Sequence, residues 1–168
     1  MSELSPLASE LRDGLRRLAK AVVVITCRHE GQRFAMAATA VSELSMDPPS
    51  LLVCVNRTAS LHEPLEQGAD FCVNILHRDH SEISAACSGK ARGEARFAIG
   101  EWGAMPDGCP MLEDAQASFF CRNEQAMSYG THRIVIGRVE AVRIAGEVDP
   151  LVYADGRYFG LGGPITEP

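Results

Sequence analysis

The segment Ala21-Val22-Val23-Val24-Ile25-Thr26-Cys27 is dominated by β-branched and other apolar residues. Such side chains favour extended backbone, and a continuous apolar run of this length is typical of a strand that is buried on both faces. The residues that follow, His29-Glu30-Gly31-Gln32, predict a turn. We therefore expect Arg33–Val41 to form a hairpin with this strand.

Outside this hairpin, apolar runs and alternating patterns predict further strands, at residues 50–56, 70–76, 115–123, 133–144, 151–153 and 158–161. Three helices are expected, at residues 5–19, 60–67 and 79–87. The first has a cap at Ser5 and a leucine stripe, and the second begins with the Ser60-x-x-Glu63 form of a capping box. Residues 89–114 are rich in Gly, Pro and charge and are expected to be mostly loop.

This order of elements predicts a mainly β protein, a barrel with short flanking helices. Several strands carry apolar residues on both faces, which favours a closed or nearly closed barrel because closure also removes exposed edges. No composition shift or linker divides the chain, so residues 1–168 are expected to form one domain.

Composition excludes several classes of protein. Apolar residues make up 46% of the chain and charged residues 23%, which is ordinary for a folded globular protein. The net charge of −6 argues against nucleic acid as a partner, since binders of the phosphate backbone carry a basic surplus. No apolar run approaches the roughly 18 residues of a membrane span, and no secretory signal begins the chain. Six well-separated cysteines without a Cys-x-x-Cys pair indicate reduced thiols and a cytoplasmic location.

Common catalytic motifs are missing from the sequence. There is no Gly-x-Gly-x-x-Gly after a strand, no P-loop, no Gly-x-Ser-x-Gly elbow and no His-Glu-x-x-His. His77 and His80 have the spacing of metal ligands, but an exposed turn with two solvated histidines is the simpler interpretation, and no metal site is expected.

Three segments are candidates for ligand contacts. Residues 35–42 are rich in small side chains, which would let a flat ligand lie against backbone amides, although a tightly packed strand is the favoured explanation on this evidence alone. Arg57 and Ser60 precede a predicted helix and could bind a phosphate, or Ser60 could be an ordinary cap. His132 follows Gly130 at the start of a long strand, where a structural role is the common one.

Taken in order, several short segments resemble the flavin reductase domain family. They are Ala38-Thr39-Ala40-Val41, Asp47-Pro48-Pro49, Leu52-Val53-Cys54-Val55-Asn56, Phe71-Cys72-Val73-Asn74-Ile75-Leu76, Gly130-Thr131-His132, Pro150-Leu151-Val152-Tyr153 and Gly156-Arg157-Tyr158. No one of these segments is specific, but their ordered set is, and it extends from about residue 10 to 161. The small reductase components of two-component aromatic hydroxylases are similar.

The resemblance implies a split β-barrel that binds FMN or FAD, usually as a homodimer. It implies that NADH or NADPH stacks on the flavin without a Rossmann fold and reduces it by hydride transfer. The reduced flavin would then pass to a separate oxygenase component. Two other functions remain open: a flavoprotein oxidase of the pyridoxamine-phosphate-oxidase type, which retains its flavin, and a flavin-binding protein without catalysis.

The resemblance also assigns roles to residues of this chain. Flavin contacts are implied along two strands, at Ala38, Thr39, Ala40, Val41, Ser45, Cys54, Val55 and Asn56. Contacts to the phosphate or adenine side are implied at Arg57, Ser60, Gly89 and Lys90. Contacts to the nicotinamide are implied at His132, Arg157 and Tyr158, with His132 orienting the ring.

Two positions depart from the family's pattern. Ala37 stands where many relatives have a hydroxyl, and Glu43 stands where many have serine. A carboxylate beside a flavin phosphate would repel it, so either Glu43 points away from the phosphate or the ligand differs.

Overall fold

A computed structural model describes residues 5–162 of the chain. The predicted hairpin is present: β2 (Val23–His29) pairs with β3 (Gln32–Ala38) in antiparallel register. Glu30 and Gly31, at the turn, both have positive φ, 48° and 79°, the backbone geometry that matches the twist of a two-residue hairpin. The partner strand is shorter than the expected Arg33–Val41, because the chain leaves β2 at Ala38 and starts a new strand at Val41.

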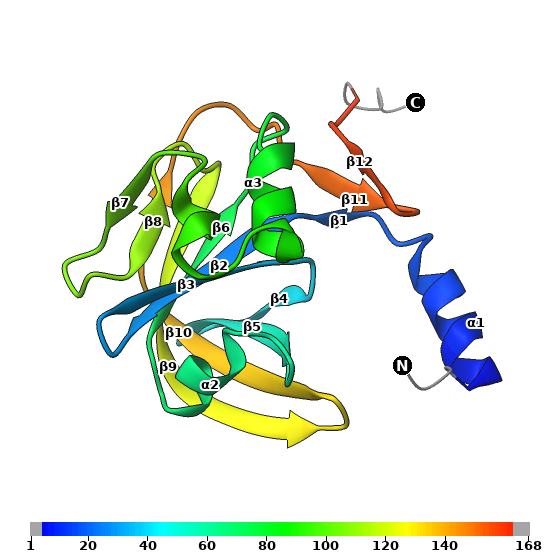
Figure 1. The fold of residues 1–168 in the computed structure, drawn as a ribbon, viewed down its shortest axis with the longest axis horizontal. Coiled ribbons are helices and arrows are strands. Elements are labelled where there is room, and N and C mark those ends of the chain that lie inside the picture. Colours follow the sequence, from blue (N-terminus) through cyan, green and yellow to red (C-terminus); the bar gives the residue numbers. More distant parts are fainter. Residues whose placement is uncertain (1–4, 163–168) are drawn as a thin grey trace.

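Seven antiparallel strands form the main sheet, in the order β3-β2-β6-β9-β10-β5-β4 (Figure 1). The five strands not yet bounded are β4 (Val41–Met46), β5 (Pro49–Asn56), β6 (Phe71–Ile75), β9 (Ala117–Tyr129) and β10 (His132–Ile144). The mainly β prediction is confirmed. The expected closure is not found, because the edge strands β3 and β4 follow each other in the chain but share no ladder among the described residues.

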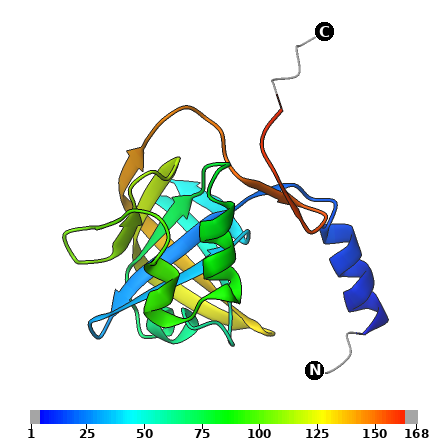
Figure 2. The same cartoon turned by 45° about the horizontal axis from the view of Figure 1, so that its top comes forward.

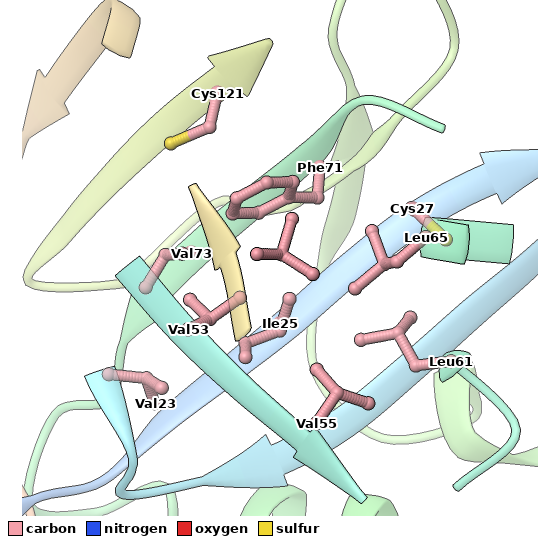
Figure 3. Packing of buried hydrophobic residues seen from close by; sticks show 11 residues of the cluster. Val23, Ile25, Cys27, Val53, Val55, Leu61, Leu65, Phe71, Val73 and Cys121 are labelled. Carbon is pink, nitrogen blue, oxygen red and sulfur yellow. The ribbon is translucent and has the colours of Figure 1, made fainter. Parts of the chain in front are cut away.

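The interior of the curled sheet is a continuous apolar core. Side chains from both halves of the sheet meet there (Figure 3): Val23, Ile25, Cys27, Phe71 and Val73 from β2 and β6, and Val53, Val55, Cys121 and Val135 from β5, β9 and β10. Leu61 and Leu65 close one end of the core, and Leu65 lies on α2 (His62–Glu66). Burial of these side chains is the main source of stability for the sheet.

Gly137 is required by this packing. A Cβ built on it would lie 2.4 Å from Cζ of Phe71 and 2.7 Å from Cβ of Cys121. We expect Gly137→Ala to lower the free energy of unfolding by about 1–3 kcal/mol, the usual cost of overpacking a core. Thermal and denaturant unfolding measure this change. Gly14→Ala is the matched control, since nothing lies within 4 Å of its Cβ position, and equal stability of the two variants would contradict the expectation.

A second layer covers the outer face of β2 and β6. It comprises α3 (Ser81–Ala85), the π-helical turn η1 (Ala86–Lys90), the 3-10 helix η2 (Gly93–Phe97), β7 (Trp102–Ala104) and β8 (Pro110–Leu112). The expectation of mostly loop at residues 89–114 therefore holds only for the connections between these short elements. These elements are too short to show a period in the sequence, and contacts with the sheet stabilise them.

Buried polar groups fasten this layer to the sheet. The side-chain oxygen of Asn74 accepts hydrogen bonds from the Leu112 amide (3.0 Å) and the Ser118 hydroxyl (2.9 Å), and its amide group donates to the Val24 carbonyl (3.1 Å). His80 is also buried and donates to the Asp114 carboxylate (3.1 Å), so the expected turn with two solvated histidines is wrong for this residue. Among the described residues, no three His, Cys, Asp or Glu side chains gather to form a metal site.

The N-terminal helix lies apart from the main sheet (Figure 2). Helix α1 (Pro6–Leu15) is capped by Ser5 as predicted, but it ends four residues before the expected boundary at residue 19. Much of its leucine stripe is exposed among the described residues: Leu7 and Leu11 are 75% and 61% exposed. β1 (Lys20–Ala21) joins β11 (Val152–Ala154) and β12 (Arg157–Phe159) in a small second sheet. No helix in the described part of the chain could cross a membrane.

Candidate functional site

The small-residue segment connects the two edges of the sheet. Thr39 and Ala40 cross from β3 to β4, and the Ala40 carbonyl accepts a hydrogen bond from the Cys54 amide (3.0 Å). A pocket of about 650 Å³ opens beside this crossing. Four predicted flavin contacts line it, Thr39, Ala40, Val41 and Cys54. Most of its remaining lining is apolar, which suits a planar aromatic ring.

A smaller hollow of about 300 Å³ lies on the other side of Thr39. It brings Ala38 and Thr39 together with Tyr158, which comes from the C-terminal strand β12. The Tyr158 hydroxyl shares a hydrogen bond of 2.9 Å with the Ser84 hydroxyl. Ala37, Ser84 and Ser88 also line the hollow, and the Ser88 hydroxyl donates a hydrogen bond to the Ser84 carbonyl (2.7 Å).

His132 is the first residue of β10 and lies beside the last residue of β5. It is paired across the ladder with Asn56, and the Arg57 amide donates to the Thr131 carbonyl (3.0 Å). The His132 ring is exposed, and its Nδ1 atom hydrogen bonds with the Thr131 hydroxyl (2.9 Å). The structure thus brings three predicted site residues, Asn56, Arg57 and His132, to one end of the sheet.

Ser60 is not the helix cap that its motif predicts. Helix α2 begins at His62 after Leu61 and has no side-chain cap. The Ser60 hydroxyl instead accepts a hydrogen bond from Nη1 of Arg96 (2.6 Å), and the same nitrogen donates to the Ala35 carbonyl (2.6 Å). Arg96 thus places a cation beside the hydroxyl expected to bind phosphate, and this Ser60–Arg96 site has the chemistry of an anion site.

Sequence reasoning missed Arg96, because nothing in the pattern of residues 89–114 distinguishes it from Arg92. Arg33, on β3, holds the 3-10 helix η2 that carries Arg96 in place. The Arg33 guanidinium forms an ion pair with Glu94 and lies 4.2 Å above the centre of the Phe97 ring. Hydrogen bonding from Arg33 lowers the pKa of Glu94, so the pair stays ionised at neutral pH. These contacts fix η2 on both sides of Arg96.

Some predicted residues lie outside these pockets. The Val55 side chain is fully buried in the core, so only its backbone could face a ligand. Ser45 accepts a hydrogen bond from the Asp47 amide (3.1 Å) and belongs to the turn before the cis Asp47-Pro48 bond. Two others, Gly89 and Arg157, are exposed and line none of the pockets described here.

Glu43, which departs from the family's pattern, lies at the pocket beside the crossing. Glu43 lines the 650 Å³ pocket, whose lining includes neither Ser60 nor Arg96. The position of Glu43 relative to a bound phosphate stays a prediction.

The cysteines differ sharply in their accessibility. All six are free thiols, and burial raises the pKa of Cys27, Cys72 and Cys121 to about 12 and that of Cys87 to about 11. Burial also raises the pKa of Cys109. Cys54 is partly exposed and lines the 650 Å³ pocket.

We expect Cys54 to be the first thiol alkylated in the native protein. The buried thiols resist alkylation because they are inaccessible and remain protonated at about pH 8. Mass spectrometry after brief iodoacetamide treatment measures the order of modification, and excess FMN should slow the reaction at Cys54. Unchanged labelling with FMN present would place the flavin away from Cys54, and loss of labelling in Cys54→Ser is the control.

The fold and the site together define a class of protein. A curled antiparallel sheet carries an apolar pocket where small residues cross between its two edges. Residues 15–162 match the model of the flavin reductase like domain, and the chain belongs to this family.

Particular relatives are similar over nearly the whole chain. An FMN reductase (NADH) RutF of Methylorubrum populi is 40% identical over 151 residues, covering 90% of this chain and 75% of the relative. The reductase component of an FADH(2)-dependent resorcinol hydroxylase from a Rhizobium species is 41% identical, covering 94% and 90%. Among solved structures, the styrene monooxygenase flavin reductase of Pseudomonas putida superimposes with a TM-score of 0.81 at 27% identity, covering 92% and 99%.

Proposed function

We propose that this protein is an NADH-dependent flavin reductase that supplies reduced flavin to a separate oxygenase. One observation carries the proposal: the fold brings the apolar pocket at Thr39, the Ser60–Arg96 site and His132 together around the end of β5. The names of the relatives support it, since they include NADH-dependent FMN reductases and the reductase component of a hydroxylase.

The residues present fit a flavin. The pocket at the crossing has the volume and apolar lining for the ring, and the Arg96 guanidinium and Ser60 hydroxyl can bind its phosphate. Bound flavin supplies the acceptor, at N5, for a hydride from C4 of NADH. The protein contributes placement: His132 orients the nicotinamide, and Tyr158, fixed by Ser84, flanks it.

The decisive experiment is oxidation of NADH and of NADPH with FMN, FAD or riboflavin added separately. The proposal requires NADH oxidation that depends on added flavin and turns over many flavin molecules per enzyme. Tightly bound flavin without reduction of added flavin would identify an oxidase instead. Bound flavin without any oxidation of NADH or NADPH would identify a protein that only binds flavin.

We also propose that the protein is a homodimer whose interface lies on the outer face of β5 and β10. Several side chains on this face alternate with the core residues and are apolar: Leu52, Met127, Ile134 and Ile136. Met127 is exposed and the other three are half-buried. Burial of such a face against a second copy is the usual solution for an exposed apolar patch. We propose that the sheet, open between β3 and β4, corresponds to the split barrel that the family resemblance implies.

Size-exclusion chromatography with light scattering tests whether the protein is a homodimer. Wild type should elute as a dimer, and Ile136→Lys should shift it to the monomer because it would bury an unpaired charge. Gln32→Lys, at the exposed start of β3, should remain dimeric. A monomeric wild type would refute the homodimer. The six free thiols support a reducing compartment, and we propose the cytoplasm.

A further inference from the structure

Helix α1 presents an apolar face that the described part of the chain leaves exposed. Leu7, Leu11 and Leu15 lie on one side of the helix, at intervals of four residues, and all three are exposed. The helix stands apart from the main sheet in both views of the fold (Figure 1, Figure 2). A helix of ten residues is marginal in water without tertiary contacts, so α1 needs a surface against which this leucine face packs.

Contacts at the C-terminal end of α1 fix it in this position. The Asp155 amide donates a hydrogen bond to the Arg16 carbonyl (2.8 Å), and Nε of Arg16 donates to the Asp155 carboxylate (2.9 Å). Asp155 lies in the turn between β11 and β12, so the helix is tied to the small second sheet. Held there, its leucine face does not pack on the main sheet of its own chain.

The inner face of the main sheet is exposed at one end. Phe119 packs against the core, and Val142 is its cross-strand partner, so both side chains lie on the inner face. Ile144, two residues further along β10, lies on the same face. Val142 and Ile144 are nevertheless 51% and 78% exposed. The apolar core thus continues into an exposed surface at this end of the sheet.

The edge strand β4 extends this surface. Met46, its last residue, is paired with Pro49, two residues before Leu51, which packs against the core. Met46 therefore also lies on the inner face, and it is 84% exposed. We call this surface the inner-face patch, and its members are Met46, Leu51, Phe119, Val142 and Ile144.

The inner-face patch is continuous with the pocket at Thr39. Leu51 and Phe119 line that pocket, and so does Glu43, which is paired with Leu51 and shares the inner face. Leu52, on the outer face of β5, lines the same pocket. The patch therefore adjoins both the proposed flavin pocket and the outer face of β5 and β10 that is proposed as the dimer interface.

We propose that α1 of each copy packs its leucine face on the inner-face patch of a second copy and so completes the wall of the partner's flavin pocket. A reciprocal exchange buries both apolar surfaces and is closed by two-fold symmetry. The charges are complementary, because Glu43 at the patch can pair with either of two exposed arginines at the C-terminal end of the helix, Arg12 or Arg17. This inference rests on the proposed flavin reductase function and adds a second copy to its site.

Cross-linking between introduced cysteines tests the exchange. In a Cys54→Ser background, the chain that carries both Leu11→Cys and Val142→Cys is treated with a short bismaleimide, and the products are separated on a denaturing gel. We expect a product of twice the chain mass, in about fivefold or higher yield than from Asp13→Cys with Val142→Cys, because Asp13 lies on the opposite side of α1. Each single-cysteine chain measures linkage between identical positions.

Two results of this experiment would overturn the exchange. A linked product of single-chain mass would place α1 on the sheet of its own chain. Equal dimer yields from the Leu11 and Asp13 variants, or no linked product, would leave the leucine face to a different protein.

The combined variant Leu7→Ser with Leu11→Ser tests the contribution of α1 to the site. Both positions are exposed in the single chain, so the fold should survive, which a melting curve verifies. We expect the dissociation constant of the dimer to rise about tenfold or more in sedimentation experiments, and that of FMN about threefold or more. Glu10→Ser with Asp13→Ser, on the polar side of the helix, is the matched control and should change neither.

The outcomes separate this inference from the proposed function. Unchanged dimerisation and unchanged FMN affinity in the leucine variant would refute the exchange while the wild type continued to reduce flavin. A wild type that oxidises no NADH with added flavin would refute the proposed function, even if the cysteine variant formed the expected link between copies.

Discussion

Arg96→Ala should weaken FMN affinity about 10- to 100-fold, because a charge-assisted hydrogen bond to phosphate contributes about 1.5–3 kcal/mol. Riboflavin, which has no phosphate, should bind almost as well as to wild type. The expectation follows from the position of the guanidinium, which donates at 2.6 Å to the Ser60 hydroxyl. Quenching of flavin fluorescence during titration measures both affinities.

Two further variants help to interpret the effect of Arg96→Ala on flavin affinity. Arg92→Ala, an exposed arginine on the same segment, is the matched control and should change neither affinity. Arg57→Ala tests the cation that the sequence favoured, and loss of FMN affinity with little change for riboflavin would show that Arg57 also contacts the phosphate. Equal loss of FMN and riboflavin binding in Arg96→Ala would show that Arg96 acts on packing through its bond to Ala35.

His132→Ala should slow flavin reduction about 10- to 100-fold and raise the KM for NADH, since a misplaced nicotinamide loses the reacting geometry. The residue is exposed, and within residues 5–162 the ring hydrogen bonds only to the neighbouring Thr131, so thermal stability should change little. FMN affinity should also change little. Stopped-flow reduction at saturating NADH, with a melting curve for the same preparation, measures these effects.

A role for His132 in folding alone would give the opposite result. The variant would then melt at a lower temperature while its folded fraction reduced flavin at the wild-type rate. Thr131→Val is a useful companion, because it removes the hydroxyl that hydrogen bonds Nδ1 but keeps the imidazole. If His132 orients the nicotinamide, Thr131→Val should give a weaker defect of the same kind.

Much of the fold is predictable because local chemistry specifies it. The β-branched run before Cys27 forms β2, and Gly31 supplies the positive φ of its turn. The alternation from Arg133 to Ile144 predicts β10 almost to the residue. Where patterns are short or mixed, prediction fails: β9 extends to Tyr129, well past the predicted end at Asn123, because pairing with β10 stabilises its polar half.

Some residues of the candidate site can likewise be predicted from the sequence, and others cannot. Small residues at Thr39 and Ala40 and the Asn56–Arg57 strand end can be found from the sequence, since their chemistry is visible in consecutive residues. The capping motif at Ser60 misleads, because a short motif cannot show that Arg96 competes for the same hydroxyl. Contacts between residues far apart in the chain depend on how the sheet curls, and no local pattern records that.

By itself, the sequence determined most strands of the main sheet, the hairpin and the ordered motifs of a flavin reductase, because side-chain shape and backbone preference act between neighbours in the chain. Only the tertiary structure decided that the sheet stays open between β3 and β4. It also decided that Ser60 accepts a hydrogen bond from Arg96 instead of capping α2, and that the Tyr158 and Ser84 hydroxyls share a hydrogen bond. Each of these depends on the packing of segments distant in sequence. Such packing is set by the shape and burial of the whole core and by no single stretch of it.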